Sequence, residues 1–255
     1  VVTKLLSKTE IDFLEGELWE TTQHISEINF LTIAPQNICK KLELEKKSLG
    51  YYLSGHPVLA IEDKIKKISS HKINQLNNDI KKSSLVCLIN SVRQIKDRQG
   101  KPLTFINFDD GTGTMDGIIA SDTLENCHNF LKEGEILNLK GTIEVDDYRT
   151  NDLGSLMFRM RVKEVSQIDN ELNKKLKEVV INLDNSQIFS IEEFSKILDT
   201  VDRSFWENGN CRLNVKVTTD KSEAIIDIGE NFKFNPSLEN LFYLEDIFGK
   251  NILET

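Results

Sequence analysis

Basic side chains alternate with apolar ones in the segment 158–163, and this spacing suits contact with a polyanion. Alternate side chains of an extended strand point to opposite faces, so the cations of this segment should share one face. A second basic group lies in 93–101, beside a single acid. Cations gathered in this way can neutralise the phosphates of a nucleic acid. The candidate phosphate-binding residues are Arg93, Lys96, Arg98, Lys101, Arg159, Arg161 and Lys163. A merely solvated strand face is the alternative, and we favour phosphate binding because the two groups should lie on adjacent elements.

An aromatic residue lies beside this basic group. The segment 102–108 alternates so that Ile106 and Phe108 should share one face, with Phe105 and Asn107 on the other. A nucleic-acid base stacked on Phe105 would contribute about 1–3 kcal/mol. The alternative, which the sequence leaves equally open, is that Phe105 contacts the helices that precede this strand.

Three carboxylates near this strand raise the question of a metal site. Two-metal phosphoryl transfer needs carboxylates that converge on ions about 4 Å apart. Asp109 and Asp110 instead open the tight turn 109–113, where Asp accepts local backbone bonds and glycine tolerates positive φ. His56, between glycine and proline, is likewise expected to be a turn residue. No P-loop, dinucleotide-binding or Ser/His/Asp pattern is present, so we expect no catalytic residue, metal or cofactor in this segment.

Composition restricts where binding can occur. The net charge is −9 and the sequence pI is about 5.1, so nucleic acid must be met by a local basic patch. The cysteines (Cys39, Cys87, Cys127 and Cys211) are scattered, as are the histidines, which argues against zinc and against a disulfide framework. We therefore expect a cytoplasmic protein, and no apolar run is long enough to span a bilayer.

The elements that must position these residues follow the order of an OB-fold. That fold is a five-stranded barrel with a helix between the third and fourth strands. Periodicity predicts strands at 85–95, 102–108, 114–120, 135–145 and 155–165, with the helix at 122–131.

The chain divides into three predicted parts. A helical segment, 1–83, contains helices at 37–53 and 61–68. The OB-fold occupies 84–168, and a small α+β domain occupies 169–255. In the last part the patterns predict strands at 179–183, 211–217 and 224–228, and helices at 191–198 and 237–248.

The final helix carries more apolar surface than one buried stripe needs. At about 100° per residue its large side chains span well over half the circumference. A small domain should cover one side only, so we expect part of this surface to be exposed as an interface. The residues concerned are Leu241, Phe242, Leu244 and Phe248. The alternative is that Phe232 and Phe234 fold back and cover the second side.

The segment 45–57, Glu-Lys-Lys-Ser-Leu-Gly-Tyr-Tyr-Leu-Ser-Gly-His-Pro, closely resembles the segment before the OB-fold in the alpha subunit of bacterial DNA polymerase III. The resemblance continues through 108–113, Phe-Asp-Asp-Gly-Thr-Gly, and 131–134, Leu-Lys-Glu-Gly. The first motif is specific, whereas the OB motifs alone are shared with aminoacyl-tRNA synthetases. The chain is similar to the C-terminal region of that family.

This resemblance implies a DNA-directed DNA polymerase whose active site lies upstream of the present segment. It implies that the OB-fold contacts single-stranded template and that the terminal domain binds the tau subunit of the clamp loader. It also implies a sliding-clamp peptide before the OB-fold. The matching residues are Leu18 and Trp19, with Glu15 where the family has Gln.

Two other functions stay open. One is an unrelated OB module, such as the anticodon-binding part of a synthetase, against which the motif 51–57 and the extra domain argue. The other is a protein-interaction scaffold that has lost nucleic-acid binding, which the net negative charge leaves open.

Overall fold

The computed structural model describes residues 38–96, 100, 102–147, 150, 156–183, 203–206, 209–218, 222–228, 233–248 and 253–254. The chain divides into two compact units, Val1–Gln36 and Asn37–Thr255. Leu18 and Trp19 belong to the first unit and lie outside the described residues. Within the described ranges, no helix has the length and apolar character needed to cross a membrane.

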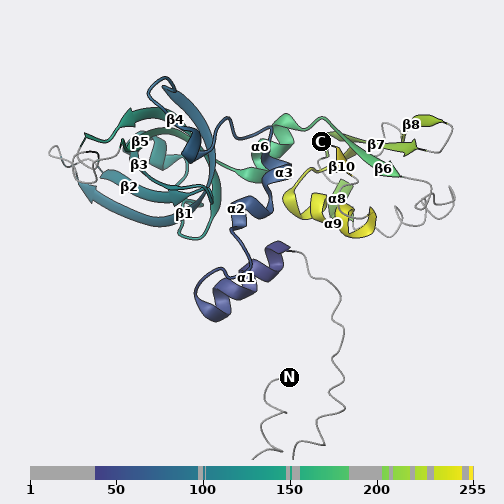
Figure 1. Cartoon of the computed structure of the whole chain (residues 1–255), viewed down its shortest axis with the longest axis horizontal. Helices are drawn as coiled ribbons and strands as arrows, with labels where there is room; N and C mark the ends of the chain where they lie inside the picture. The colour runs from purple at the N-terminus through teal and green to yellow at the C-terminus, as the bar shows by residue number, and fades with distance from the viewer. Residues whose placement is uncertain are drawn as a thin grey trace, which may run out of the picture. The chain divides into compact units, whose positions relative to one another are not determined.

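Five strands of the second unit close into a barrel (Figure 1). The strand order is β1-β2-β3-β5-β4, in which β3 and β5 pair in parallel and the other pairs are antiparallel. This is the OB-fold that the sequence predicts. The strands are β1 (Lys82–Lys96), β2 (Pro102–Asp109), β3 (Thr114–Ala120), β4 (Ile136–Val145) and β5 (Phe158–Gln167).

The barrel interior is filled by alternate residues of each strand. Ile106 and Phe108 of β2 are buried there, as the alternation predicts, together with Met115, Ile119 and Met160. Helix α4 (Ser121–Glu125) is shorter than predicted because the chain continues in turns rather than in helix. Cys127 and Leu131 of those turns nevertheless enter the barrel core.

Short helices precede the barrel. Helix α1 (Ile38–Leu49) ends earlier than predicted because Gly50 adopts the left-handed conformation, with φ of 83°. The Glu45 carboxylate then accepts the backbone N–H groups of Leu53 and Ser54 at 2.8 Å each, which fixes the following turn. The remaining helices are α2 (Pro57–Ala60), α3 (Glu62–Ile65) and the 3-10 helix η4 (Ile73–Gln75).

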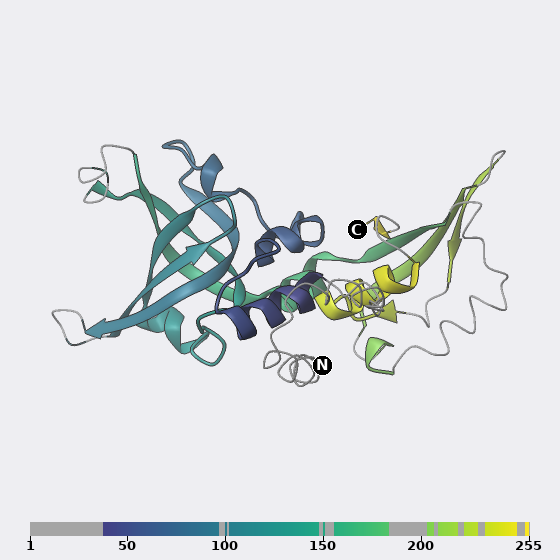
Figure 2. The same cartoon turned by 60° about the horizontal axis from the view of Figure 1, so that its bottom comes forward.

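A second sheet follows the barrel. Its order is β10-β6-β7-β8, with β9 also paired to β7. The predicted strands are confirmed at β6 (Glu178–Leu183), β7 (Cys211–Thr218) and β8 (Glu223–Asp227), and the predicted helix 191–198 lies outside the described residues. Helix α9 (yellow) lies alongside this sheet (Figure 2). The remaining elements are α6 (Ile168–Lys175), α8 (Arg203–Trp206), β9 (Lys233–Phe234), α9 (Leu238–Phe248) and β10 (Leu253–Glu254).

The second hydrophobic core joins segments that the sequence divides. Ile61 and Ile65, in the helices before the barrel, share one core with β6, β7 and α9. Lys64, almost fully buried, places its Nζ 2.5 Å from Glu245 of α9 and 4.7 Å from the Phe242 ring centre. A buried cation needs such partners. The predicted segment 1–83 therefore contributes to the same core as the predicted domain 169–255.

Candidate nucleic-acid interface

The barrel exterior carries two rows of side chains that run across the strands. Residues paired across neighbouring strands point to the same face. In the first row, Arg93 of β1 pairs with Phe105 of β2, Phe105 with Ile118 of β3, and Ile118 with Arg161 of β5. The second row contains Ser91, Asn107, Asp116 and Arg159 in the same strand order. We call these two rows the outer face.

A groove opens on the outer face over β1, β2 and β3. Phe105 lines this groove and is half-buried, whereas its neighbours Ile106 and Phe108 are covered in the barrel. Every described lining residue comes from a barrel strand, so within the described part of the chain the preceding helices do not line the groove side of Phe105. The predicted projection of Phe105 onto the open face is confirmed. The lining residues are Ser91, Arg93, Ile95, Phe105, Ile106, Asn107 and Asp116.

A chain of amide and carboxylate groups crosses the second row. Asn90 donates from Nδ2 to Asn107 Oδ1 at 3.2 Å, and Asn107 donates from Nδ2 to Asp116 Oδ1 at 2.7 Å. These two bonds fix the orientation of the Asn107 amide, with its nitrogen toward Asp116.

The cations of β5 lie on the outer face but share an acid. Arg161 Nε is 3.1 Å from Glu144 Oε1, and Arg159 is 3.6 Å from Glu144 Oε2. The hydrogen bond from Arg161 is the main cause of a lowered pKa for Glu144, so this carboxylate stays ionised at neutral pH. The pair of arginines therefore carries less net charge than the sequence indicates, although the Arg161 side chain is still 62% exposed.

The remaining predicted cations are only partly described. Arg93 and Lys96 are exposed on β1, and Lys163 is exposed on β5. Arg98 and Lys101 lie outside the described residues. The described cations thus lie on β1 and β5, on either side of the strand β2 that carries Phe105.

The acidic turn after β2 is structural, as predicted. Asp110 Oδ1 accepts the backbone N–H groups of Thr112 and Gly113, and Oδ2 accepts that of Ile73 at 2.7 Å. Asp109 accepts the backbone N–H of Gly111. In the part of the chain that the structure describes, no group of three or more His, Cys, Asp or Glu side chains is arranged to hold a metal ion.

His56 connects the segment 45–57 to this turn, a contact that sequence reasoning missed. Its Nδ1 accepts the Val58 N–H at 3.3 Å at the start of α2, and its Nε2 lies 3.2 Å from Asp109 Oδ1. Burial lowers the pKa of His56, opposed by Asp109 and Asp110. Gly111 has φ of 83°, and a Cβ there would lie 2.7 Å from Leu59 Cγ. The Gly-His-Pro motif therefore packs directly on the β2–β3 turn.

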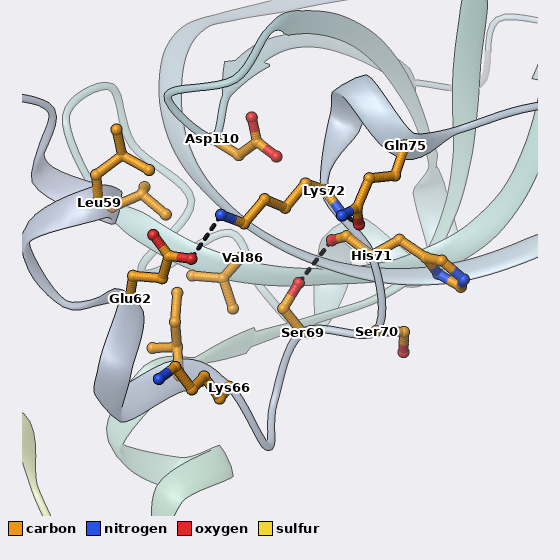
Figure 3. Close-up of a pocket in the computed structure, with 12 residues that line it drawn as sticks. Leu59, Glu62, Lys66, Ser69, Ser70, His71, Lys72, Gln75, Val86 and Asp110 are labelled. Carbon is orange, nitrogen blue, oxygen red and sulfur yellow. Dashed lines mark hydrogen bonds and ion pairs between the residues drawn. The ribbon is translucent and has the colours of Figure 1, made fainter.

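A second pocket lies beside this contact, between α2, α3, η4 and the barrel (Figure 3). Lys72 extends across it toward Glu62, with Nζ and Oε1 2.5 Å apart, and the Asp110 carboxylate lies nearby. Its apolar residues include Val58, Leu59 and Val86. The lysine and glutamate bind each other, the Ser69 hydroxyl donates to the backbone carbonyl of His71, and the His71 ring contacts Ser83, so we assign the pocket no chemistry.

The terminal helix differs from the prediction. Leu241, Phe242, Leu244 and Phe248 are all buried, with exposed fractions of 0–9%. The expectation that part of this set is exposed is wrong, because more than one layer covers α9. Of the two residues that the alternative names, Phe234 of β9 enters the same core and Phe232 lies outside the described residues. Lys64 of α3 lies over the Phe242 ring. Tyr243 is the large apolar residue of α9 that stays exposed.

Comparison with known proteins agrees with this geometry. Residues 86–168 match the family model described as an OB-fold nucleic acid binding domain. The DNA polymerase III subunit alpha of Pseudomonas fluorescens is 23% identical over 212 residues, which is 83% of this chain and 17% of the relative. The Haemophilus influenzae subunit is 25% identical over 243 residues, covering 94% of this chain and 20% of the relative. The chain is similar to DNA polymerase III alpha subunits over most of its length.

The alpha subunit of Bacillus subtilis gives a comparable match, at 26% identity over 214 residues, or 83% of this chain and 18% of the relative. The chain thus spans about a fifth of the length of the alpha subunits that it matches. Among solved structures, the SSB domain of a Synechococcus protein matches at a TM-score of 0.29 with 7% identity, covering 36% of this chain and 100% of that domain. A match at this score supports no conclusion about function.

Proposed function

We propose that this chain is the OB-fold region of a replicative DNA polymerase alpha subunit and that its outer face binds single-stranded DNA. The observation that carries the proposal is the first row, in which Phe105 and Ile118 lie between Arg93 and Arg161. An apolar platform with a cation at each end is the arrangement that single-stranded nucleic acid binds. Bases stack on the aromatic ring, and phosphates meet the guanidinium groups.

The dimensions of the row suit a strand that crosses the barrel. Neighbouring strands lie about 4.8 Å apart, so Arg93 and Arg161 are three strand spacings, or about 14 Å, apart along the curved barrel wall. Both side chains are exposed and long enough to reach a backbone on either side of a stacked base. Glu144 moderates the charge at the β5 end, so we expect weak affinity with a small number of phosphate contacts.

The activity of the whole protein is part of the same proposal. The relatives are DNA polymerases by name, and we infer that the parent of this segment is one. The segment itself contributes binding rather than catalysis, since the carboxylates at 109 and 110 are engaged by backbone N–H groups.

We also propose the clamp loader tau subunit and the sliding clamp as partners, on the resemblance described above. Clamp contact would use Leu18 and Trp19. A tau-binding surface on the terminal domain would use exposed residues such as Tyr243, since Leu241, Phe242, Leu244 and Phe248 are committed to the core. Pull-down with purified tau and clamp would test both partners, with the chain lacking residues 1–36 as the control for the clamp.

A titration of labelled single-stranded DNA tests the main proposal. The wild-type chain should bind an oligonucleotide of about twelve nucleotides, within the site size of one OB-fold. The dissociation constant should rise with salt, because each phosphate contact releases counterions. An excess of folded tRNA should compete less well than single-stranded DNA. Absence of binding at low salt, or displacement by tRNA alone, would contradict the proposal and would favour an interaction scaffold or an anticodon-binding module.

A further inference from the structure

We propose that Asp116 is a base-reading residue of the groove, and that it selects bases carrying an exocyclic amino group, such as cytosine, over thymine. This inference rests on the proposed binding of single-stranded DNA to the outer face and adds a base preference to it. It follows from the position of Asp116 relative to Phe105 and from what its carboxylate can accept.

Asp116 lies where the edge of a stacked base would reach. Phe105 and Asn107 are two residues apart on one face of β2, a separation of about 6.8 Å along the strand. Asp116 lies directly opposite Asn107 on β3, and all three residues line the groove. A base stacked on the Phe105 ring and extending along the strand therefore places its polar edge over Asn107 and Asp116.

The groove presents a carboxylate acceptor at this position. The Asn107 oxygen already accepts from Asn90, and its amide nitrogen already donates to Asp116 at 2.7 Å. An ionised carboxylate has two oxygens and about four acceptor sites, and it donates nothing. Because a carboxylate accepts from several donors at once, Asp116 can accept from a base in addition to the partners that it already has, of which Asn107 is one.

This acceptor discriminates between the pyrimidines. Cytosine presents the N4 amino group, which donates to Asp or Glu, whereas thymine presents the O4 acceptor and a methyl group at the corresponding place. A carboxylate facing O4 would be repelled. The carboxylate also repels phosphate, so it keeps the phosphates of a bound strand over the first row, where Arg93 and Arg161 lie.

A structural role is the competing explanation for Asp116. Its bond to Asn107 joins β2 to β3, and its task would then be to hold the barrel wall. The two explanations differ in what Asp116→Asn does. The isosteric amide keeps an oxygen for Asn107 but presents a donor as well, so a base-reading role predicts a change of base preference in a chain that stays folded.

The test compares oligo(dC) and oligo(dT) of about twelve nucleotides at neutral pH and fixed salt, by fluorescence anisotropy. The wild-type chain should bind oligo(dC) about five- to ten-fold more tightly than oligo(dT), the lower end of what a base-edge contact provides. Asp116→Asn should abolish or reverse this ratio. Asp79→Asn, the same charge change at an exposed position outside the groove, should leave the ratio unchanged.

The outcomes separate this inference from the proposed function. Binding of both oligonucleotides with equal affinity would overturn the role of Asp116 and leave the proposed function intact. A cytosine preference that survives in Asp116→Asn would also overturn it. Failure to bind either oligonucleotide would contradict the proposed function, and the base-reading role with it.

Discussion

The outer face of the barrel and the terminal helix α9 both carry large apolar side chains, but the structure treats them in opposite ways. Phe105 keeps one side accessible in a groove between Arg93 and Asn107. Leu241 and Leu244 are buried in the core that also contains residues of β6, β7 and β9 and of the segment that precedes the barrel. A side chain on a strand points to one face of the sheet, and it stays accessible when nothing packs on that face. The side chains of a helix point in all directions around its axis, so elements on several sides can bury them. Apolar surface on a strand is therefore the better indicator of a ligand face in this chain.

The largest expected effect is a loss of folding stability when a buried residue of α9 is truncated. Leu241→Ala should lower the free energy of unfolding by about 2–5 kcal/mol, since the side chain is fully buried and its removal leaves a cavity. Chemical denaturation measures this change. Asp246→Ala, exposed on the same helix, should change stability by about 0.5 kcal/mol or less. If Leu241→Ala left stability unaltered, the helix would not be packed as described.

The next effect concerns the groove. Phe105→Ala should weaken binding of single-stranded DNA by about 1–3 kcal/mol, or roughly five- to more than one hundred-fold, because a stacking surface is lost. Tyr51→Ala removes an exposed aromatic ring that lies outside the outer face and serves as the control. Anisotropy titration would compare the two variants. Equal affinity of both variants and the wild type would show that bases do not stack on Phe105.

A smaller effect on DNA affinity is expected from the charge of Glu144, which Arg159 and Arg161 share. Glu144→Gln should strengthen DNA binding several-fold, because it releases Arg159 and Arg161 from their shared carboxylate. The slope of log K against log salt should also steepen, by about 0.7 for each additional phosphate of the single strand that the arginines neutralise. Glu125→Gln on α4 removes the same charge outside the face. Weaker binding by Glu144→Gln would indicate that Glu144 holds the arginines in their binding position.

The smallest expected effect is on pH dependence. Burial lowers the pKa of His56 in the folded chain, so the unfolded chain binds more protons as pH falls below about 6.5. Its contribution to stability is therefore present above that pH and is lost progressively as pH falls toward the depressed value. His56→Asn, which retains a side-chain acceptor for Val58, should flatten the fall in stability below about pH 6.5, as measured by denaturation at a series of pH values.

The sequence predicts the barrel well because its strands alternate over a single core. Ile106 and Phe108 inside and Phe105 outside follow from a period of two, and the acidic turn at 109–113 follows from the chemistry of Asp and Gly. The net charge around the cations of the barrel is not predictable from the sequence in the same way. Arg159 and Arg161 have the predicted positions, but their shared partner Glu144 lies on another strand and cannot be found from spacing.

Long-range packing explains what the sequence missed. The surplus apolar surface of α9 predicted exposure only because the helices before the barrel were assigned to another part of the chain. Nothing in the local sequence indicates that Lys64, a charged residue in a short helix, is buried over the Phe242 ring and paired with Glu245. The contact between His56 and Asp109 joins two motifs that were each visible in the sequence, yet nothing local showed that they meet.

Photo-crosslinking can show whether DNA contacts the outer face of the barrel or helix α9, because it samples both regions in one experiment. Single-stranded DNA containing a photoreactive pyrimidine would be crosslinked to the wild-type chain, and the modified peptides identified by mass spectrometry. We expect crosslinks in β2 at or beside Phe105 and none in α9. Crosslinks confined to 238–248, or a crosslinking pattern unchanged by Phe105→Ala, would contradict the assignment of the outer face as the DNA-binding surface.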